Sequence, residues 1–150
     1  MFSTSGTTTG IDLGSKFVKL VRARGSARPE NLISVGVEAI ETTGEDSWSR
    51  DAGAALRRLL KKQHLGSRNL GRVITAVCGA SVQLRHVDLP PLDEKELRAS
   101  LKYEARKHLS LGSSGESALD CQVISRSATG PMNTLLVGAP EALVAAQVDV

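Results

Sequence analysis

The most strongly marked local signal in the sequence is the start of a helix at Asp93. Glu96 follows three residues later, which is the spacing of a capping box, where each side chain accepts from the other residue's backbone amide. Leu92 and Leu97 flank this cap and are placed to form a hydrophobic staple. The sequence therefore predicts a helix over 93–111. Its buried stripe is expected to contain Leu97, Leu101, Ala105, His108 and Leu109.

Runs typical of strands stand on both sides of this helix. They cover 82–89 before it, and 119–125 and 134–138 after it. This order predicts a small β-α-β-β unit in which the helix covers one face of the sheet. Residues 141–150 then begin a further helix that stops without a closing signal.

The front of the sequence has a different order of elements. Residues 8–13, 17–24 and 32–40 read as three successive strands, which predicts an antiparallel meander. Helical spacing follows over 48–63. The run 72–79 is apolar after its first residue, which is typical of a buried central strand.

Composition narrows the class of protein. The hydrophobic fraction is 41% and the aromatic fraction is 3%, so a chain of 150 residues has enough apolar side chains for a core, and that core must be aliphatic. The net charge is only +3, and the densest basic run, 57–62, contains no aromatic side chain. We expect this run to be a solvated helix face and expect no nucleic-acid partner.

Neither cysteine chemistry nor membrane insertion is indicated. Cys78 and Cys121 lack the paired spacing of zinc or redox motifs, so two reduced thiols are expected. The first residues are polar rather than apolar, and no apolar run approaches the length of a membrane span. These features predict a cytoplasmic protein.

The first strand-like run ends in Asp12, Leu13, Gly14, Ser15 and Lys16. A glycine lets a backbone approach a phosphate closely, a hydroxyl and an ammonium group bind phosphate oxygen, and a carboxylate binds Mg²⁺. The same five residues also suit a plain hairpin turn that uses its glycine for backbone freedom. The residues alone leave both interpretations open.

Three other side chains are expected to have structural roles. Trp48 begins a predicted helix and is placed to anchor it on the sheet. Arg85 is expected to pair with an acid on a neighbouring element, and Glu104 is expected to form a hydrogen bond or ion pair within the chain.

The order of five segments resembles the PilM family of type IV pilus assembly proteins. These segments are GIDLGSKFVKLVRA, VQLRHVDLP, LDEKELRASLKYEARKHLSL, LDCQVI and NTLLVGAP, and the third carries the aromatic-Glu pair Tyr103-Glu104. The chain is more distantly similar to FtsA division proteins and to the cytoplasmic domains of type II secretion L proteins. The first segment is shared by the whole actin, Hsp70 and sugar-kinase class.

The resemblance implies an α/β fold with mixed sheets, corresponding to part of an actin-like protein. Residues 1–80 would form the front of the first-lobe core, and 81–150 an inserted β-α-β-β-(α) subdomain, truncated in its last helix. ATP and Mg are implied for full-length relatives. Asp12, Leu13, Gly14, Ser15 and Lys16 would form the first phosphate loop, with Asp12 as a candidate Mg ligand. Since the loop is half of an ATP site, we expect no catalytic residues and no stably bound cofactor.

The resemblance also implies a partner. The N-terminal tail of a PilN-like inner-membrane protein would dock in a groove between the first-lobe core and the inserted subdomain, near Gly79-Ala80-Ser81. Other pilus assembly proteins would bind as well, and the chain would be peripheral to the inner membrane through its partner. The alternatives are a fragment of another actin-like ATPase, of the FtsA or type II secretion L type, or a sugar kinase-like enzyme. A sugar kinase would need a catalytic acid at a strand end, and the sequence supplies no such constellation.

Overall fold

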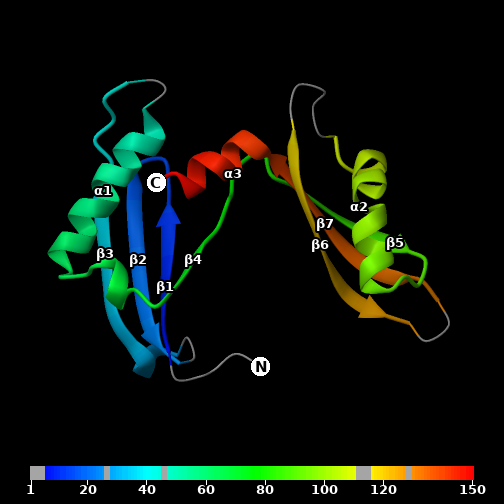
Figure 1. The fold of residues 1–150 in the computed structure, drawn as a ribbon, viewed down its shortest axis with the longest axis horizontal. Coiled ribbons are helices and arrows are strands. Elements are labelled where there is room, and N and C mark those ends of the chain that lie inside the picture. The colour runs from blue at the N-terminus through cyan, green and yellow to red at the C-terminus, as the bar shows by residue number, and fades with distance from the viewer. Residues whose placement is uncertain (1–5, 26–27, 45–46, 111–115, 128–129) are drawn as a thin grey trace. The chain divides into compact units, whose positions relative to one another are not determined.

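The computed structural model describes residues 6–25, 28–44, 47–110, 116–127 and 130–150. The chain forms two compact units, one of residues 1–76 and 146–150 and the other of residues 77–145. Figure 1 shows the elements of each unit. The two units are described separately below.

The first unit is a four-stranded sheet with one long helix, in the strand order β3-β2-β1-β4. Strands β1 to β3 are successive antiparallel neighbours, so the predicted meander is confirmed. Strand β4 pairs in parallel with β1, and α1 lies in the connection that such a parallel pairing requires. The elements are β1 (Thr7–Leu13), β2 (Phe17–Arg24), β3 (Leu32–Ala39), α1 (Trp48–Lys62) and β4 (Arg72–Thr75).

Helix α1 packs its small and aliphatic side chains on one face of this sheet. Ala52, Ala55 and Leu59 are buried there against apolar side chains of β1 and β2, and Trp48 packs at the margin of the same core. Gly36 of β3 allows the close approach, because a Cβ atom at this position would lie 2.7 Å from a terminal methyl carbon of Leu59. The predicted role of Trp48 as an anchor is therefore confirmed.

The prediction of a buried central strand over 72–79 is wrong. Only residues 72–75 form a strand, β4, and all four of them are exposed. The strand lies at an edge of the sheet, next to β1 alone. Its apolar composition resembles that of a central strand, but its position gives it one neighbour instead of two.

The second unit is a three-stranded antiparallel sheet in the order β5-β7-β6, with α2 on one face. Strand β7 is central and buries Met132, Thr134 and Leu136 on the side of α2. This is the predicted β-α-β-β order, followed by a third helix. The elements are β5 (Gln83–Leu89), α2 (Glu94–His108), β6 (Ser117–Arg126), β7 (Met132–Pro140) and the first part of α3 (Glu141–Val148), up to residue 145.

Helix α2 begins with the predicted capping box. The Asp93 carboxylate accepts from the backbone amide of Glu96 at 2.8 Å, and the Glu96 carboxylate accepts from the amide of Asp93 at 2.8 Å. Leu97, Ala105 and Leu109 are buried as expected, while Leu101 is half-buried. The helix ends at His108, and the predicted last position, 111, lies outside the described residues.

The expected inward position of His108 is wrong. Its side chain is 40% exposed and its Nε2 atom lies 3.5 Å from the Glu104 carboxylate, which places it at the outer edge of the apolar stripe. The described end of the chain also differs from the domain boundaries expected. Residues 146–150 fall with the first unit, because the Gln147 amide donates to Thr75 Oγ1 at 2.7 Å and Val150 packs on the first core.

Candidate functional site

The turn after β1 is a tight hairpin between β1 and β2. The Gly14 amide donates to the Phe17 carbonyl at 3.0 Å, which closes the turn. A Cβ atom at Gly14 would lie 3.0 Å from that carbonyl oxygen, tighter than side chains normally tolerate. Glycine therefore allows the two backbone segments to approach without a shift of the Phe17 carbonyl.

Two further hydrogen bonds tie this turn to the rest of its unit. Trp48 Nε1, at the start of α1, donates to the Gly14 carbonyl at 3.0 Å. The Ile40 amide, just after β3, donates to the Lys16 carbonyl at 2.9 Å. The turn is thus held from the helix and from the end of the third strand, while the Ser15 and Lys16 side chains remain exposed.

The acid of the turn has a cation beside it that sequence reasoning did not select. Asp12 and Lys19 lie opposite each other on β1 and β2, and Lys19 Nζ is 2.8 Å from the Asp12 carboxylate. Their side chains are 51% and 54% exposed, respectively, so solvent screens the pair. Lys19 could have been found by pairing 12 with 19 across a hairpin centred on residues 15 and 16.

The fit of this turn to a phosphate and Mg²⁺ is partial. Ser15 and Lys16 offer exposed polar groups, but the Gly14 amide and the Asp12 carboxylate already have partners. Within the described ranges, no group of three or more His, Cys, Asp or Glu side chains is arranged to hold a metal ion. The phosphate role of Asp12, Leu13, Gly14, Ser15 and Lys16 stays a prediction.

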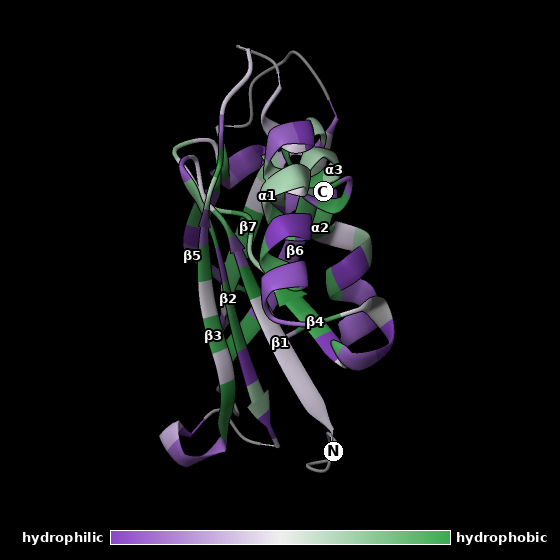
Figure 2. Ribbon diagram, turned by 90° about the vertical axis from the view of Figure 1, so that its left-hand side faces the viewer, coloured by the Kyte–Doolittle hydropathy of each residue, from purple (hydrophilic) through white to green (hydrophobic). Residues whose placement is uncertain are grey.

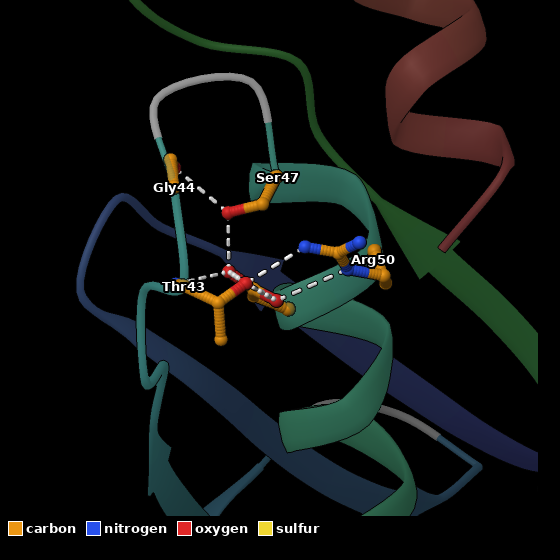
Figure 3. Close-up of polar contacts among 5 residues, drawn as sticks. Thr43, Gly44, Ser47 and Arg50 are labelled. Carbon is orange, nitrogen blue, oxygen red and sulfur yellow. Dashed lines mark hydrogen bonds and ion pairs between the residues drawn. The ribbon is translucent and has the colours of Figure 1, made fainter.

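A buried carboxylate organises the start of α1. Asp51 is 5% exposed and accepts from the Thr43 amide at 2.7 Å and from the Ser47 hydroxyl, and Arg50 Nε lies 3.6 Å away (Figure 3). The hydrogen bond from Ser47, followed by that from Thr43, lowers the pKa of Asp51 to about 2. These contacts connect the loop before α1 to its first turn, which is a structural role.

The basic run of α1 is not the uniformly solvated face that was expected. Arg58 Nε lies 3.1 Å and Lys62 Nζ 2.6 Å from the carboxylate of Glu38 on β3, whose side chain is only 10% exposed. The hydrogen bond from Lys62, followed by that from Arg58, lowers the pKa of Glu38. Arg57 and Lys61 do point to solvent.

Of the remaining structural expectations, one is confirmed and one is wrong. Glu104 forms ion pairs with Lys107 at 3.2 Å and His108 at 3.5 Å, as expected. Arg85 donates to the Leu84 carbonyl at 3.0 Å rather than to an acid, because its neighbour across the sheet is the apolar Leu136.

An apolar groove of about 290 Å³ lies within the second unit, beside the segment Gly79-Ala80-Ser81. Gly79 has a φ of 129°, which favours glycine, and its carbonyl accepts from the Val82 amide at 3.1 Å. Most of the groove lining is aliphatic, with Asp120 as its one charged residue. The lining comprises Val77, Val82, Ala118, Leu119, Asp120, Val137, Ala139 and Val144.

No protein-family model matches this sequence, and no curated protein matches it. Among solved structures, a chain of a "PilM-PilN type IV pilus biogenesis complex" is similar, with a TM-score of 0.71 and 18% sequence identity. The match covers 95% of this chain and 43% of that chain, so this chain spans less than half of its neighbour's length. The expected mixed α/β fold is confirmed, and it matches part of that chain's fold. In the part of the chain that the structure describes, no helix is long and apolar enough to cross a membrane.

Proposed function

We propose that this chain is part of a scaffold of the type IV pilus assembly machinery and binds the N-terminal tail of a PilN-like inner-membrane protein. The observation that carries the proposal is the fold it shares with a chain of a PilM-PilN complex, over 95% of its length. Such a scaffold would be cytoplasmic and would reach the inner membrane, and other pilus assembly proteins, through its partner.

The apolar groove of the second unit supports a tail of this kind. A short extended peptide satisfies its backbone against a groove or strand edge while alternate apolar side chains fill pockets. The groove beside Gly79-Ala80-Ser81 is lined by valine and alanine side chains and is open to solvent. Because ordering a flexible tail costs entropy for each residue fixed, we expect an affinity roughly in the micromolar range.

Calorimetric titration with the first dozen or so residues of the PilN-like protein from the same organism tests this function. We expect binding to the chain and none with a scrambled peptide. Val137→Asp should abolish binding, because it places a charge in the groove. Val35→Asp is the matched control, because Val35 is 60% exposed in the first unit and outside the groove. Equal binding of both peptides, or equal loss with both variants, would refute the proposal.

The proposal includes a half-site for ATP at Asp12, Leu13, Gly14, Ser15 and Lys16. A phosphate site made by one turn lacks the second phosphate loop through which catalysis by positioning works. The isolated chain should therefore bind ATP weakly or not at all and should not hydrolyse it. Turnover that is lost in Asp12→Ala would show that the site is more complete than proposed, and turnover that survives would place it elsewhere.

A second candidate function is a fragment of another actin-like ATPase, of the FtsA or type II secretion L type. The hairpin turn after β1 is common to that wider class, so it does not separate the candidates. Failure of the PilN-like peptide together with binding of a division or secretion partner would favour this alternative.

A further inference from the structure

Strand β6 leaves one edge of the second sheet open. In the order β5-β7-β6 it pairs with β7 only, and no described strand lies on its other side. In an antiparallel pair, alternate residues of an edge strand direct their backbone amide and carbonyl groups away from the partner strand. The direction of those groups in β6 determines which residues could form hydrogen bonds with an added strand at this edge.

Two hydrogen bonds fix this direction. The Glu116 carbonyl accepts from the Glu141 amide at 3.0 Å, so the even-numbered positions from 116 to 122 bond toward β7, up to the register shift between Val123 and Ser125. The Cys121 amide instead donates to the side chain of Asp120 at 2.8 Å. Leu119, Cys121 and Val123 therefore present their backbone groups at the open edge.

The same three residues line a groove between β6 and α2. Its volume is about 450 Å³, and Leu97 and Leu101 form part of the facing wall. The core side chains of β5 and β7 in this unit, such as Val87 and Leu136, are buried. The corresponding side chains of β6 remain half-buried.

One end of the groove has an excess of positive charge. Arg126 Nη1 donates to the Leu92 carbonyl at 2.7 Å, which places the end of β6 beside the start of α2. Arg98, also lining the groove, lies 3.1 Å from Glu94. This end therefore carries two guanidinium groups and one carboxylate, of which Arg98 and Glu94 form an ion pair, and all three side chains are exposed.

We propose that the open edge of β6 and its groove bind an extended peptide that adds a strand to the sheet. Alternate apolar side chains of the peptide enter the groove, and an acidic residue meets Arg98 and Arg126. This is recognition by strand addition, in which backbone hydrogen bonds give affinity and alternate pockets give specificity. The site goes beyond the function proposed above, because it uses the open edge of β6 and the groove beside α2, although Leu119 and Asp120 line both grooves.

The Asp120 side chain controls access to the backbone groups at this edge. Its carboxylate occupies the Cys121 amide, the middle of the three open positions. Charged side chains at sheet edges also serve to block unwanted pairing. Under the proposal an incoming peptide displaces this carboxylate, so Asp120→Ala strengthens binding by roughly fivefold, the equivalent of one hydrogen bond. If the edge is permanently blocked instead, neither the parent chain nor the Asp120→Ala variant will bind any probe peptide.

The test uses the full chain and a probe peptide of ten residues, which is the length of β6. The peptide alternates valine with threonine and carries a terminal aspartate. Two further versions are N-methylated at either the odd or the even positions. N-methylation removes donors along one edge of the peptide only. One version should bind at least tenfold more weakly and the other as well as the parent, since roughly three hydrogen bonds are lost. Equal behaviour of the two versions would overturn the proposal.

Two variants and a chemical probe locate the binding. The double change Arg98→Gln and Arg126→Gln should weaken the aspartate peptide by roughly threefold. It should leave the binding of a peptide with asparagine in that place unaffected. The double change Arg57→Gln and Lys61→Gln, at exposed positions on α1, is the charge-matched control. With Cys78→Ser, Cys121 is the only cysteine, and saturating peptide should slow its alkylation at least tenfold. An unchanged alkylation rate, or equal weakening of both peptides, would refute the site even if the PilN-like tail binds.

Discussion

Replacement of Leu97 and of Leu101 by alanine tests where the core of the second unit ends. The two leucines are four residues apart on α2 and differ in burial. Leu97 is 4% exposed and lies in the core with Val87, Met132 and Leu136. Leu101 packs against the same core but is half-buried and lines the groove beside β6.

Because the two leucines differ in burial, their replacement should lower the free energy of unfolding by different amounts. Leucine-to-alanine changes in a closed core cost about 2–5 kcal/mol, from lost transfer free energy plus the cavity left behind. Leu97→Ala falls in this range, and we expect about 3 kcal/mol. Leu101 already borders open space, so its removal widens a groove instead of creating a closed cavity, and we expect about 1 kcal/mol.

Urea unfolding followed by far-UV circular dichroism measures both changes. Lys102→Ala, at an exposed position on the same helix, is the control and should stay within about 0.5 kcal/mol of the parent. Fluorescence of Trp48, the only tryptophan, reports on the first unit in the same samples. Equal losses for the two leucines, or a larger loss for Leu101→Ala, would refute this account of the core.

Three other outcomes follow from the structure. Hydrogen bonds lower the pKa of Asp51 to about 2 in the folded chain, from about 3.9 in the unfolded chain. The stability that Asp51 contributes above about pH 4 should therefore be lost as the pH falls toward 2. Asp51→Asn should flatten the acid unfolding curve over that window. Gly36→Ala should cost about 1–3 kcal/mol by thermal or urea unfolding, because its Cβ atom would overlap a core leucine, whereas Gly66→Ala, with nothing within 4 Å, should cost far less. Iodoacetamide at pH 8 should alkylate the exposed Cys78 faster than Cys121, because burial raises the pKa of the Cys121 thiol, and mass spectrometry of the two peptides measures this.

Local signals in the sequence predicted those elements whose causes are themselves local. The capping box at Asp93 and Glu96 works through side chains three residues apart, and it forms as predicted. The three-stranded meander likewise depends on short turns between successive strands.

Burial depends on neighbours that are distant in the sequence, and there the local signal failed. The apolar residues Val73 and Ile74 of β4 are nevertheless exposed, because the place of this strand in the sheet depends on pairing with β1 across the length of α1. Several apolar side chains of β2 and β3, including Val21 and Val35, point away from α1 and are also exposed; apolar residues of these strands are green in Figure 2. The alternating pattern located one buried face but did not reveal that the other is apolar too.

The candidate site shows the same division between local and distant causes. The turn at Asp12 to Lys16 was found from residue types alone, and its shape is that of a hairpin. The ion pair between Asp12 and Lys19 needed the register of two strands, and the bond from Trp48 to Gly14 needed the packing of α1. Neither contact has a signature within a short stretch of sequence.

Gly14→Ala and Ser15→Ala distinguish two explanations for the sequence of this turn, which are steric need and phosphate binding. The alanine Cβ at position 14 would lie 3.0 Å from the Phe17 carbonyl oxygen, a backbone atom that cannot move without disturbing the hairpin and its 3.0 Å hydrogen bond. Gly14→Ala should therefore destabilise the chain by about 1–2 kcal/mol by urea unfolding, whether or not a nucleotide ever binds. Ser15 is exposed, so Ser15→Ala should leave stability unchanged and should weaken ATP binding only if the turn holds phosphate. An unaltered unfolding midpoint for Gly14→Ala would show that steric need does not explain the glycine, and phosphate binding would then become the stronger explanation.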